Sequence, residues 1–211
     1  MSCAPKTQAK KQKNGGCGGR PQTDSRPKPL SELMSEWKKK YRSRLYELLN
    51  GYRTSSFPDA LKAASRGEYP PNGKKAGKRH PHQWRLSGEA VKQWSKQLNK
   101  AQARIQAFRG QPFECLFDFL DKQARTISGI GPLMVYDTAL RIGANIGSLP
   151  KDRIYLHAGA RIPNVRPSVR HIMKSDLPGY LKALRALNAY EIEVILCVYN
   201  EQIEKLASRS S

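Results

Sequence analysis

Apolar side chains recur at helical spacing along most of the chain, and the clearest such pattern lies between residues 87 and 108. Its apolar positions follow one another at intervals of three and four residues: Val91, Trp94, Leu98, Ala101, Ile105 and Phe108. This spacing lines one face of an α-helix, and Ser87 precedes it as an N-cap residue. The apolar face of such a helix must be covered by other elements, and their patterns decide the fold class.

The same periodicity predicts helices elsewhere in the chain. We expect them over residues 31–52, 58–65, 113–127, 132–145, 167–174, 178–187 and 190–207. Pro58 lies in the first turn of its helix, where proline is tolerated, and Asn188 is interpreted as a C-cap. The predicted fold class is therefore all-α, a multi-helix domain.

The charge of the chain is high and unevenly distributed. The formal net charge is +21 over 211 residues. Residues 1–109 hold 25 Lys and Arg against 7 Asp and Glu, a net of +18, and residues 110–211 hold 13 against 10, a net of +3. Such a balance indicates an anionic partner, which is a nucleic acid, a membrane surface or an acidic protein.

The composition also predicts how the chain is organised. Residues 1–28 are rich in Lys, Gln, Gly and Pro and poor in large apolar side chains, so we expect a disordered basic tail. Residues 29–211 are expected to form a single helical domain. Its first part, 29–109, is basic and contains a loop at 66–85, and its second part is 110–211. With no apolar run of membrane-spanning length and no signal-peptide pattern, we expect an intracellular, cytoplasmic protein, nucleoid-associated if bacterial, without a membrane partner.

Residues 128–131 read Ser-Gly-Ile-Gly and separate the helices expected at 113–127 and 132–145. Glycine adopts positive φ and has no side chain to block the approach of a ligand. The helix that starts at Pro132 adds amides without intrahelical acceptors and the positive end of its dipole. A turn of this kind presents backbone N–H groups to a phosphate.

This passage resembles the helix-hairpin-helix DNA-binding motif, and it is most similar to the version in the DNA glycosylase superfamily. The resemblance covers residues 113–157 and not the whole chain. It implies that the backbone at Gly129, Ile130 and Gly131 and the amide of Leu133 contact DNA phosphates without reading sequence. It also implies a monovalent cation at the hairpin and no other cofactor.

The chain departs from that superfamily at the positions that carry catalysis. Glycosylases with lyase activity have a lysine two residues after the second glycine, where this chain has Leu133. The segment that aligns with their catalytic aspartate, residues 154–157, has no carboxylate, and Asp152 is the nearest. The cysteine cluster that holds an iron–sulfur centre in some members is also missing. We therefore expect largely sequence-independent DNA binding without glycosylase chemistry.

Other basic and aromatic side chains extend the expected contact. Like charges repeat at intervals of four residues along one helix face, where a polyanion would relieve their repulsion. The loop at 66–85 adds basic and aromatic groups, and His157 and Arg161 follow the hairpin closely. The DNA-contacting residues are thus predicted to include Lys74, Lys75, Lys78, Arg79, His82, Trp84, Arg85, Lys92, Lys96, Lys100, Arg104, His157 and Arg161.

Two alternatives to DNA binding remain open from the sequence. The first is that the chain is a divergent glycosylase or nuclease acting on damaged or structured DNA, with Asp137, Asp152 or His157 as the acid or base. The second is that the chain is an RNA-binding factor, since charge does not separate RNA from DNA.

The pair His80 and His82 has metal-ligand spacing, but it lies in a basic loop and no carboxylate cluster accompanies it, so we expect no metal site. The acidic residues of the last helix, Glu191, Glu193, Glu201 and Glu204, are expected on a side turned away from nucleic acid.

Overall fold

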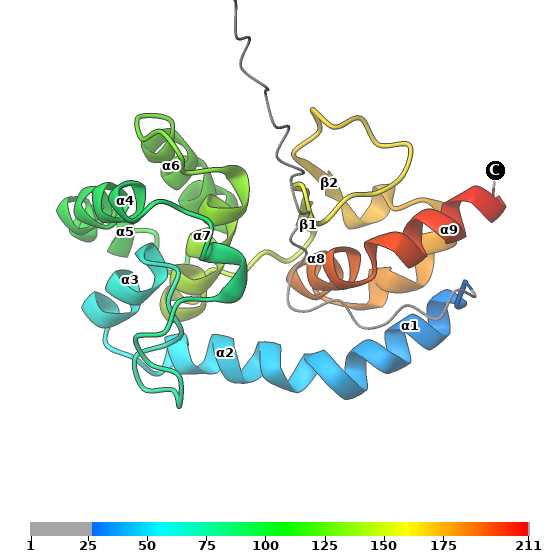
Figure 1. Ribbon diagram of the computed structural model, residues 1–211, viewed down its shortest axis with the longest axis horizontal. Helices are drawn as coiled ribbons and strands as arrows, with labels where there is room; N and C mark the ends of the chain where they lie inside the picture. The colour runs from blue at the N-terminus through cyan, green and yellow to red at the C-terminus, as the bar shows by residue number, and fades with distance from the viewer. Residues whose placement is uncertain (1–26, 211) are drawn as a thin grey trace, which may run out of the picture.

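The computed structural model describes residues 27–210, which form a predominantly α-helical fold (Figure 1). The helices up to the hairpin and beyond it are α1 (Leu30–Trp37), α2 (Ser43–Arg53), α3 (Phe57–Ser65), α4 (Gly88–Lys100), α5 (Gln102–Gln106), α6 (Phe113–Ala124) and α7 (Pro132–Ile146). Strands β1 (Arg153–Tyr155) and β2 (His171–Met173) follow, and then helices α8 (Ala189–Val198) and α9 (Asn200–Ser210). Shorter segments are the π-helical η1 (Lys38–Arg42) and the 3-10 helices η2 (Pro81–Gln83), η3 (Lys174–Asp176) and η4 (Gly179–Ala186). The expected tail, residues 1–28, lies almost entirely outside the described range.

Helices α1 and α2 are joined through η1 into one continuous helix that runs beneath the rest of the fold (Figure 1). Leu33 and Trp37 of α1 and Leu45 and Leu49 of α2 are buried. The wider π-helical turn between them changes the angular register of the helix, so that apolar positions on both sides of it face the core. The helix expected over residues 31–52 is confirmed, with this π-helical turn as an addition.

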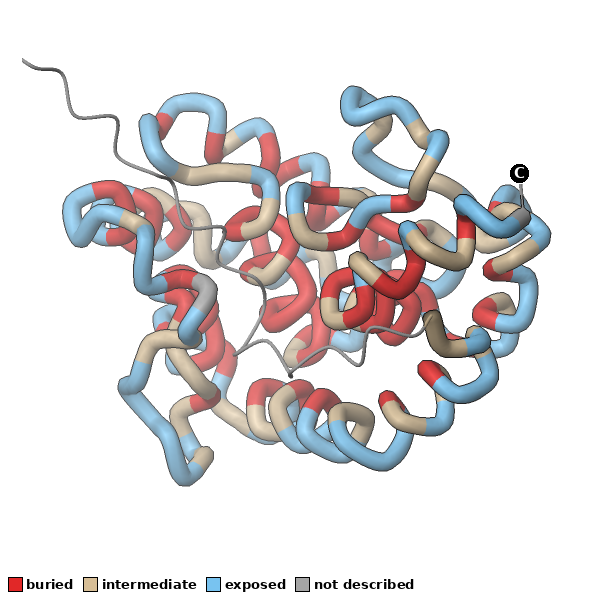
Figure 2. Tube along the Cα trace, turned by 45° about the vertical axis from the view of Figure 1, so that its right-hand side comes forward, coloured by how far each residue is buried: buried red, intermediate tan, exposed pale blue. Residues whose placement is uncertain are grey.

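Helix α7 is the centre of the first group of helices, and it packs against α2, α3 and α6. Between Met134 and Ile146 every residue is buried except Asp137 and Asn145, which are half-buried. A helix that is apolar on nearly all sides belongs in a core. In Figure 2 the buried positions accordingly gather on the inner faces of the surrounding helices, and the exposed positions lie outside.

The helix expected after Ser87 is confirmed but is interrupted. The Ser87 hydroxyl oxygen accepts a hydrogen bond from the Ala90 N–H at 3.1 Å, as an N-cap does. At Ala101 the backbone leaves helical geometry (φ −92°, ψ 10°), which separates α4 from α5. Trp94 is fully buried, and its indole N–H donates to the Thr138 hydroxyl of α7 at 3.3 Å.

The second group contains the strands, η4, α8 and α9, and here one expectation was wrong. Strands β1 and β2 pair antiparallel with Ile154 opposite Ile172, so the fold is not purely α. The helix predicted over residues 167–174 is replaced by strand β2 and the loop before it. A strand of three residues is too short for its alternating pattern to be distinguished from helical spacing, and for that reason the sequence predicted a helix here.

Helix α8 begins and ends differently from the expectation. Asn188 is its N-cap and not the C-cap of the preceding segment, because Asn188 and Glu191 form a reciprocal capping box. The helix expected over residues 190–207 breaks at Tyr199 (φ −112°, ψ 24°). A new helix, α9, then begins at Asn200, whose side-chain oxygen accepts from the Glu201 N–H at 2.8 Å.

An ion pair and an aromatic cluster join the two groups. Arg170, in the loop before β2, donates both of its terminal nitrogens to Asp121 of α6, at 3.0 and 2.7 Å. Burial raises the pKa of Asp121, but the hydrogen bonds from Arg170 and Arg125 outweigh burial and lower the pKa below its ordinary value. The ring of Tyr155 lies 4.3 Å from that of Phe117, measured between centroids, and so extends the core from α6 to β1.

Candidate nucleic-acid interface

The hairpin between α6 and α7 combines a buried anchor with an exposed backbone. Gly129 has φ +90°, a backbone conformation that residues other than glycine rarely adopt, and Gly131 is the N-cap residue of α7. Ile130, between them, is half-buried and packs against the core. Ser128 and Gly129 are exposed, so the turn presents main chain to the solvent.

Most of the hairpin amides have no internal acceptor. Within the described residues, the N–H groups of Gly129, Gly131 and Leu133 make no hydrogen bond to the backbone. The amide of Ile130 differs from the expectation, because it donates to the Ile127 carbonyl at 3.4 Å. Pro132 has no N–H. Three amides, rather than the four expected, are therefore available to an anion at this helix start.

The hairpin packs beside the first turn of α4. A Cβ atom added to Gly129 would lie 3.3 Å from the Cβ of Ala90. Further along α4, the side chain of Gln97 donates to the carbonyl of Gln123 at 3.1 Å and to Thr126 at 3.2 Å. The start of α4 and the start of α7 thus lie next to each other, and both contribute positive dipole ends.

The predicted lysine row follows α4 along its outer side. Lys92, Lys96 and Lys100 are exposed, on the side opposite the buried Trp94 and Leu98. Arg104 lies on α5 beyond the break, and its guanidinium carbon is 4.9 Å from the centre of the Phe119 ring. We call the hairpin residues 128–133 together with Lys92, Lys96, Lys100, Trp84 and Arg85 the hairpin surface.

The loop expected over residues 66–85 contacts two parts of the fold, α7 at its base and the end of α2 at its tip. At the base, Gln83 is buried, and its amide donates to the Asp137 carboxylate of α7 at 2.6 Å. This bond places the adjoining Trp84 and Arg85 between α7 and the start of α4. Trp84 is 67% exposed, and its indole N–H donates to the Arg79 carbonyl at 3.0 Å. The described residues expose no other tryptophan.

At the tip, Lys74, Lys75 and Lys78 are exposed, and the neighbouring Pro70 and Asn72 contact the end of α2. Asn72 donates to the Thr54 hydroxyl at 2.8 Å. The Nζ atom of Lys75 is 5.1 Å from the centre of the Tyr69 ring. Arg79 is half-buried, and the backbone of His82 belongs to η2, while the side chain of His82 is not among those described.

Helix α7 runs between the hairpin and the end of α2. Gly131 caps its N-terminus at the hairpin, and near its C-terminus Asn145 donates to the carbonyls of Tyr52 and Ser55 at 2.8 and 2.9 Å. The 15 residues of α7 span about 22 Å. The end of α2, to which Asn72 of the loop is bound, therefore lies at the C-terminal end of α7, whereas the hairpin lies at the N-terminus of α7.

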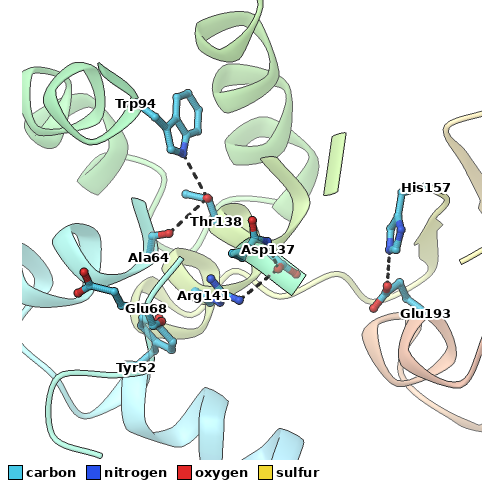
Figure 3. A network of polar contacts seen from close by, with 10 residues as sticks. Tyr52, Ala64, Glu68, Trp94, Asp137, Thr138, Arg141, His157 and Glu193 are labelled. Carbon is cyan, nitrogen blue, oxygen red and sulfur yellow. Dashed lines mark hydrogen bonds and ion pairs between the residues drawn. The ribbon is translucent and has the colours of Figure 1, made fainter. Parts of the chain in front are cut away.

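The residues proposed for catalysis are engaged in other contacts (Figure 3). His157 and Glu193 are buried, and their Nε2 and Oε1 atoms are 2.5 Å apart. Burial lowers the pKa of His157, but the bond to Glu193 and the charges of Glu193 and Asp137 outweigh burial and raise it. The imidazole therefore lies in the interior, in contrast to the DNA contact expected for it, while Arg161 is exposed.

Asp137 is the carboxylate on α7 that follows the hairpin most closely. It accepts hydrogen bonds from Gln83 and from the buried guanidinium of Arg141, the latter at 3.1 Å (Figure 3). Asp152 is exposed, and its carbonyl accepts from the Lys174 N–H. These two carboxylates and His157 are spread over α7, the start of β1 and the turn after it.

Sequence reasoning missed the buried charged residues of this region. Glu191 and Glu193 are 1% and 6% exposed, and Glu191 pairs with Arg42 at 3.0 Å, so these two acids lie in the interior, where the sequence had predicted only a side turned away from nucleic acid. The run of apolar residues around them was the available indication, since a helix that is apolar on all sides is buried together with any acid it carries.

Comparison with protein-family models, curated proteins and solved structures found no match to this chain. Among residues 27–210, no group of three or more His, Cys, Asp or Glu side chains is placed to hold a metal ion. Within the same range, no helix is long and apolar enough to cross a membrane.

Proposed function

We propose that the protein binds double-stranded DNA through the hairpin surface, largely without regard to sequence. The observation that carries this proposal is the convergence of three chain segments at one end of α7. These are the hairpin with its three amides lacking internal acceptors, the first turn of α4, and Trp84 with Arg85. Backbone amides and lysines contact phosphates, which carry no sequence information, and that is why we expect little sequence preference.

The resemblance to the helix-hairpin-helix motif supports the same proposal, since the motif uses these backbone positions. A monovalent cation at the hairpin belongs to the proposal as well. The alternatives of RNA binding and of a DNA-modifying activity are tested alongside, because duplex RNA and lesion-bearing duplexes serve as competitors in the same assay. Strand cleavage or base release that Asp137→Asn abolishes would favour the enzyme instead.

The salt dependence of binding tests the mechanism. If the protein neutralises about six to ten phosphates, its affinity should fall about 10³- to 10⁵-fold between about 50 and 200 mM salt. Fluorescence anisotropy with a labelled duplex measures this directly. An affinity that stays nearly constant over that range would contradict binding through lysines and phosphate contacts.

The hairpin itself is tested by Gly131→Val. A Cβ atom added at Gly131 meets no atom within 4 Å, and the φ of −95° is open to valine, so the fold should tolerate the substitution. The isopropyl group would fill the space in front of the amides of Gly131 and Leu133, so we expect binding to fall about tenfold or more.

Gly179→Val is the matched control. Gly179 also adjoins a proline at a helix start and also has no atom within 4 Å of an added Cβ, but it lies in the second group of elements. We expect its affinity for DNA to equal that of the unaltered chain. Equal affinities for both valine variants, with both folded by circular dichroism, would place the contact outside the hairpin.

A further inference from the structure

Trp84 is the one tryptophan side chain that the described residues leave in solvent. Its exposed fraction is 67%, whereas Trp37 and Trp94 are fully buried. Tryptophan is highly buried on average, because its side chain carries a large apolar area. An indole left in solvent at the edge of the hairpin surface is therefore open to an aromatic or apolar ligand.

The backbone that carries Trp84 is fixed on both sides. Gln83 is buried, and its amide donates to the Asp137 carboxylate at 2.6 Å. The Leu86 N–H donates to the Gln83 carbonyl at 3.2 Å, and the Leu86 carbonyl accepts from the Arg79 guanidinium at 3.4 Å. The fold thus sets the position of the indole, and little ordering is needed when a ligand arrives, which favours binding.

The indole N–H of Trp84 is satisfied within the protein. It donates to the Arg79 carbonyl at 3.0 Å, so the polar edge of the ring points at the loop. This N–H is the one polar group of the side chain. What the ring offers to solvent is its apolar π surface, and a ligand gains from it by stacking.

The surroundings of Trp84 are basic. Residues 69–88 contain five Lys and Arg and no Asp or Glu. Lys78 and Arg85 are both exposed, and each adjoins one of the two residues that the indole hydrogen bond joins. Glu89 of α4 is the exposed acid closest to Trp84 in the sequence, and its carboxylate bonds along its own helix. A π surface among cations is typical of sites where phosphates are attracted and bases stack.

Trp84 also lies close to the hairpin. Asp137, to which the base of the loop is bonded, follows Gly131 by six positions along α7. Six residues of helix rise about 9 Å, which is about three base steps at 3.4 Å per phosphate along one strand. A strand whose phosphates lie on the hairpin amides can therefore place a base on the indole about three nucleotides away.

Paired bases of a duplex are not free to stack on this indole. Each base is stacked between its neighbours, and taking one out of the duplex costs about as much free energy as one contact with an aromatic side chain returns. The cost is least for a base that is already single-stranded. The surface thus favours the point at which a duplex continues as a single strand.

We propose that the protein recognises duplex DNA that continues as a single strand, with duplex phosphates on the hairpin amides and an unpaired base stacked on Trp84. This inference rests on the proposed DNA binding at the hairpin, and it adds the class of DNA that the surface prefers. Because every base has a π face, the preference is for this structure and not for a sequence.

Fluorescence anisotropy with the full chain and labelled DNAs of three kinds tests the proposal. They are a duplex with a short unpaired extension, the same duplex with that extension fully paired, and the single strand alone. The fully paired duplex carries more phosphates, so electrostatic attraction favours it, and a preference for the unpaired extension reports on the bases. Extensions of the two polarities are measured separately.

Trp84→Ala removes the stacking ring, and Trp84→Phe keeps one. Met173→Ala is the matched control, because Met173 is also a large apolar side chain in solvent, at 40%, but lies on β2 in the second group. We expect the unaltered chain to bind the extended duplex, in at least one polarity, about fivefold or more tightly than the fully paired one, which corresponds to about 1 kcal/mol. Trp84→Ala should lose this preference, and the other two variants should keep it.

The intrinsic fluorescence of the chain gives a second measurement. Trp37 and Trp94 are buried, so quenching by DNA reports on Trp84. We expect the extended duplex to quench this emission more strongly than the fully paired duplex does. Equal quenching by the two would contradict stacking of an unpaired base.

Equal affinity of the unaltered chain for the extended and the fully paired duplex, in both polarities, would overturn the inference. A preference that Trp84→Ala retains would do so as well, and so would binding of the single strand alone as tightly as the extended duplex. In these cases salt-dependent binding of the fully paired duplex that Gly131→Val weakens would still support the proposed function. Failure of the unaltered chain to bind any of the duplexes would instead refute that function.

Discussion

Substitution of Glu193 by alanine tests whether this acid is buried and paired, as in the structure, or exposed to solvent. The carboxylate is 6% exposed and lies 2.5 Å from the Nε2 atom of His157, which is itself buried. The Nδ1 atom of the same imidazole accepts from the Gly159 N–H at 3.1 Å, so the ring proton lies on Nε2 and points at Glu193. Alanine would leave this N–H buried without an acceptor.

The expected loss is about 3 kcal/mol in the free energy of unfolding. A hydrogen bond to a charged group contributes about 1.5–3 kcal/mol, and an unsatisfied buried donor costs about 1–3 kcal/mol. For a chain of this size, each kcal/mol lowers the melting temperature by about 2–4 °C, so we expect a decrease of about 6–12 °C. Glu193→Gln keeps an oxygen that accepts from His157 and should cost about 1 kcal/mol.

Urea unfolding followed by circular dichroism measures these differences, with Glu204→Ala as the control at an exposed acid of α9. We expect the control to change stability by less than about 0.5 kcal/mol. A similarly small effect of Glu193→Ala would refute the reasoning, because it would mean that the carboxylate and the imidazole are solvated.

Three further outcomes are expected. Asp121→Asn should lower the free energy of unfolding at neutral pH, and the variant should lose less of its stability in acid. The pKa of Asp121 is lowered in the fold, so the ionised carboxylate stabilises the fold above about pH 4, and this effect is lost as the pH falls through the folded-state pKa. Unfolding measured at a series of pH values detects the difference. Trp84→Ala should weaken binding to a single-stranded oligonucleotide by about 1–3 kcal/mol, and it should leave the melting temperature unchanged because the indole is exposed. Titration calorimetry measures the affinity, and an affinity equal to that of the unaltered chain would contradict this prediction. Asn145→Ala should cost about 1–3 kcal/mol, because two carbonyls at the end of α2 lose their donor, and a thermal melt like that of the unaltered chain would contradict this.

The sequence predicted the helices that carry long, regular apolar patterns. The seam from Val91 to Phe108 and the pattern flanking Gly129 and Gly131 each repeat over three or more turns, and the structure has helices at both places. Periodicity is strongest over such lengths. The positions of helix ends were less predictable, because Asn188 begins one helix and was interpreted as ending another.

The candidate site was harder to predict, because contacts between distant segments define it. The bond between Gln83 and Asp137 joins residues 54 positions apart, and it fixes the base of the loop against α7. The pairing of His157 with Glu193 likewise joins residues 36 positions apart. Composition and spacing do not show which distant residues pair, so the predicted site grouped residues that are close in the sequence.

The continuous helix through α1, η1 and α2 also determines the order in which the chain can complete its fold during synthesis. Leu33 and Trp37 are fully buried, and α1 packs against η4 and α8. Those elements are made about 150 residues later, and translation at about 5–20 residues per second needs about 8–30 s to reach them. For that time the apolar face of α1 lacks its partners, whereas α2 can be covered earlier, once α7 has been made about 90 residues after it.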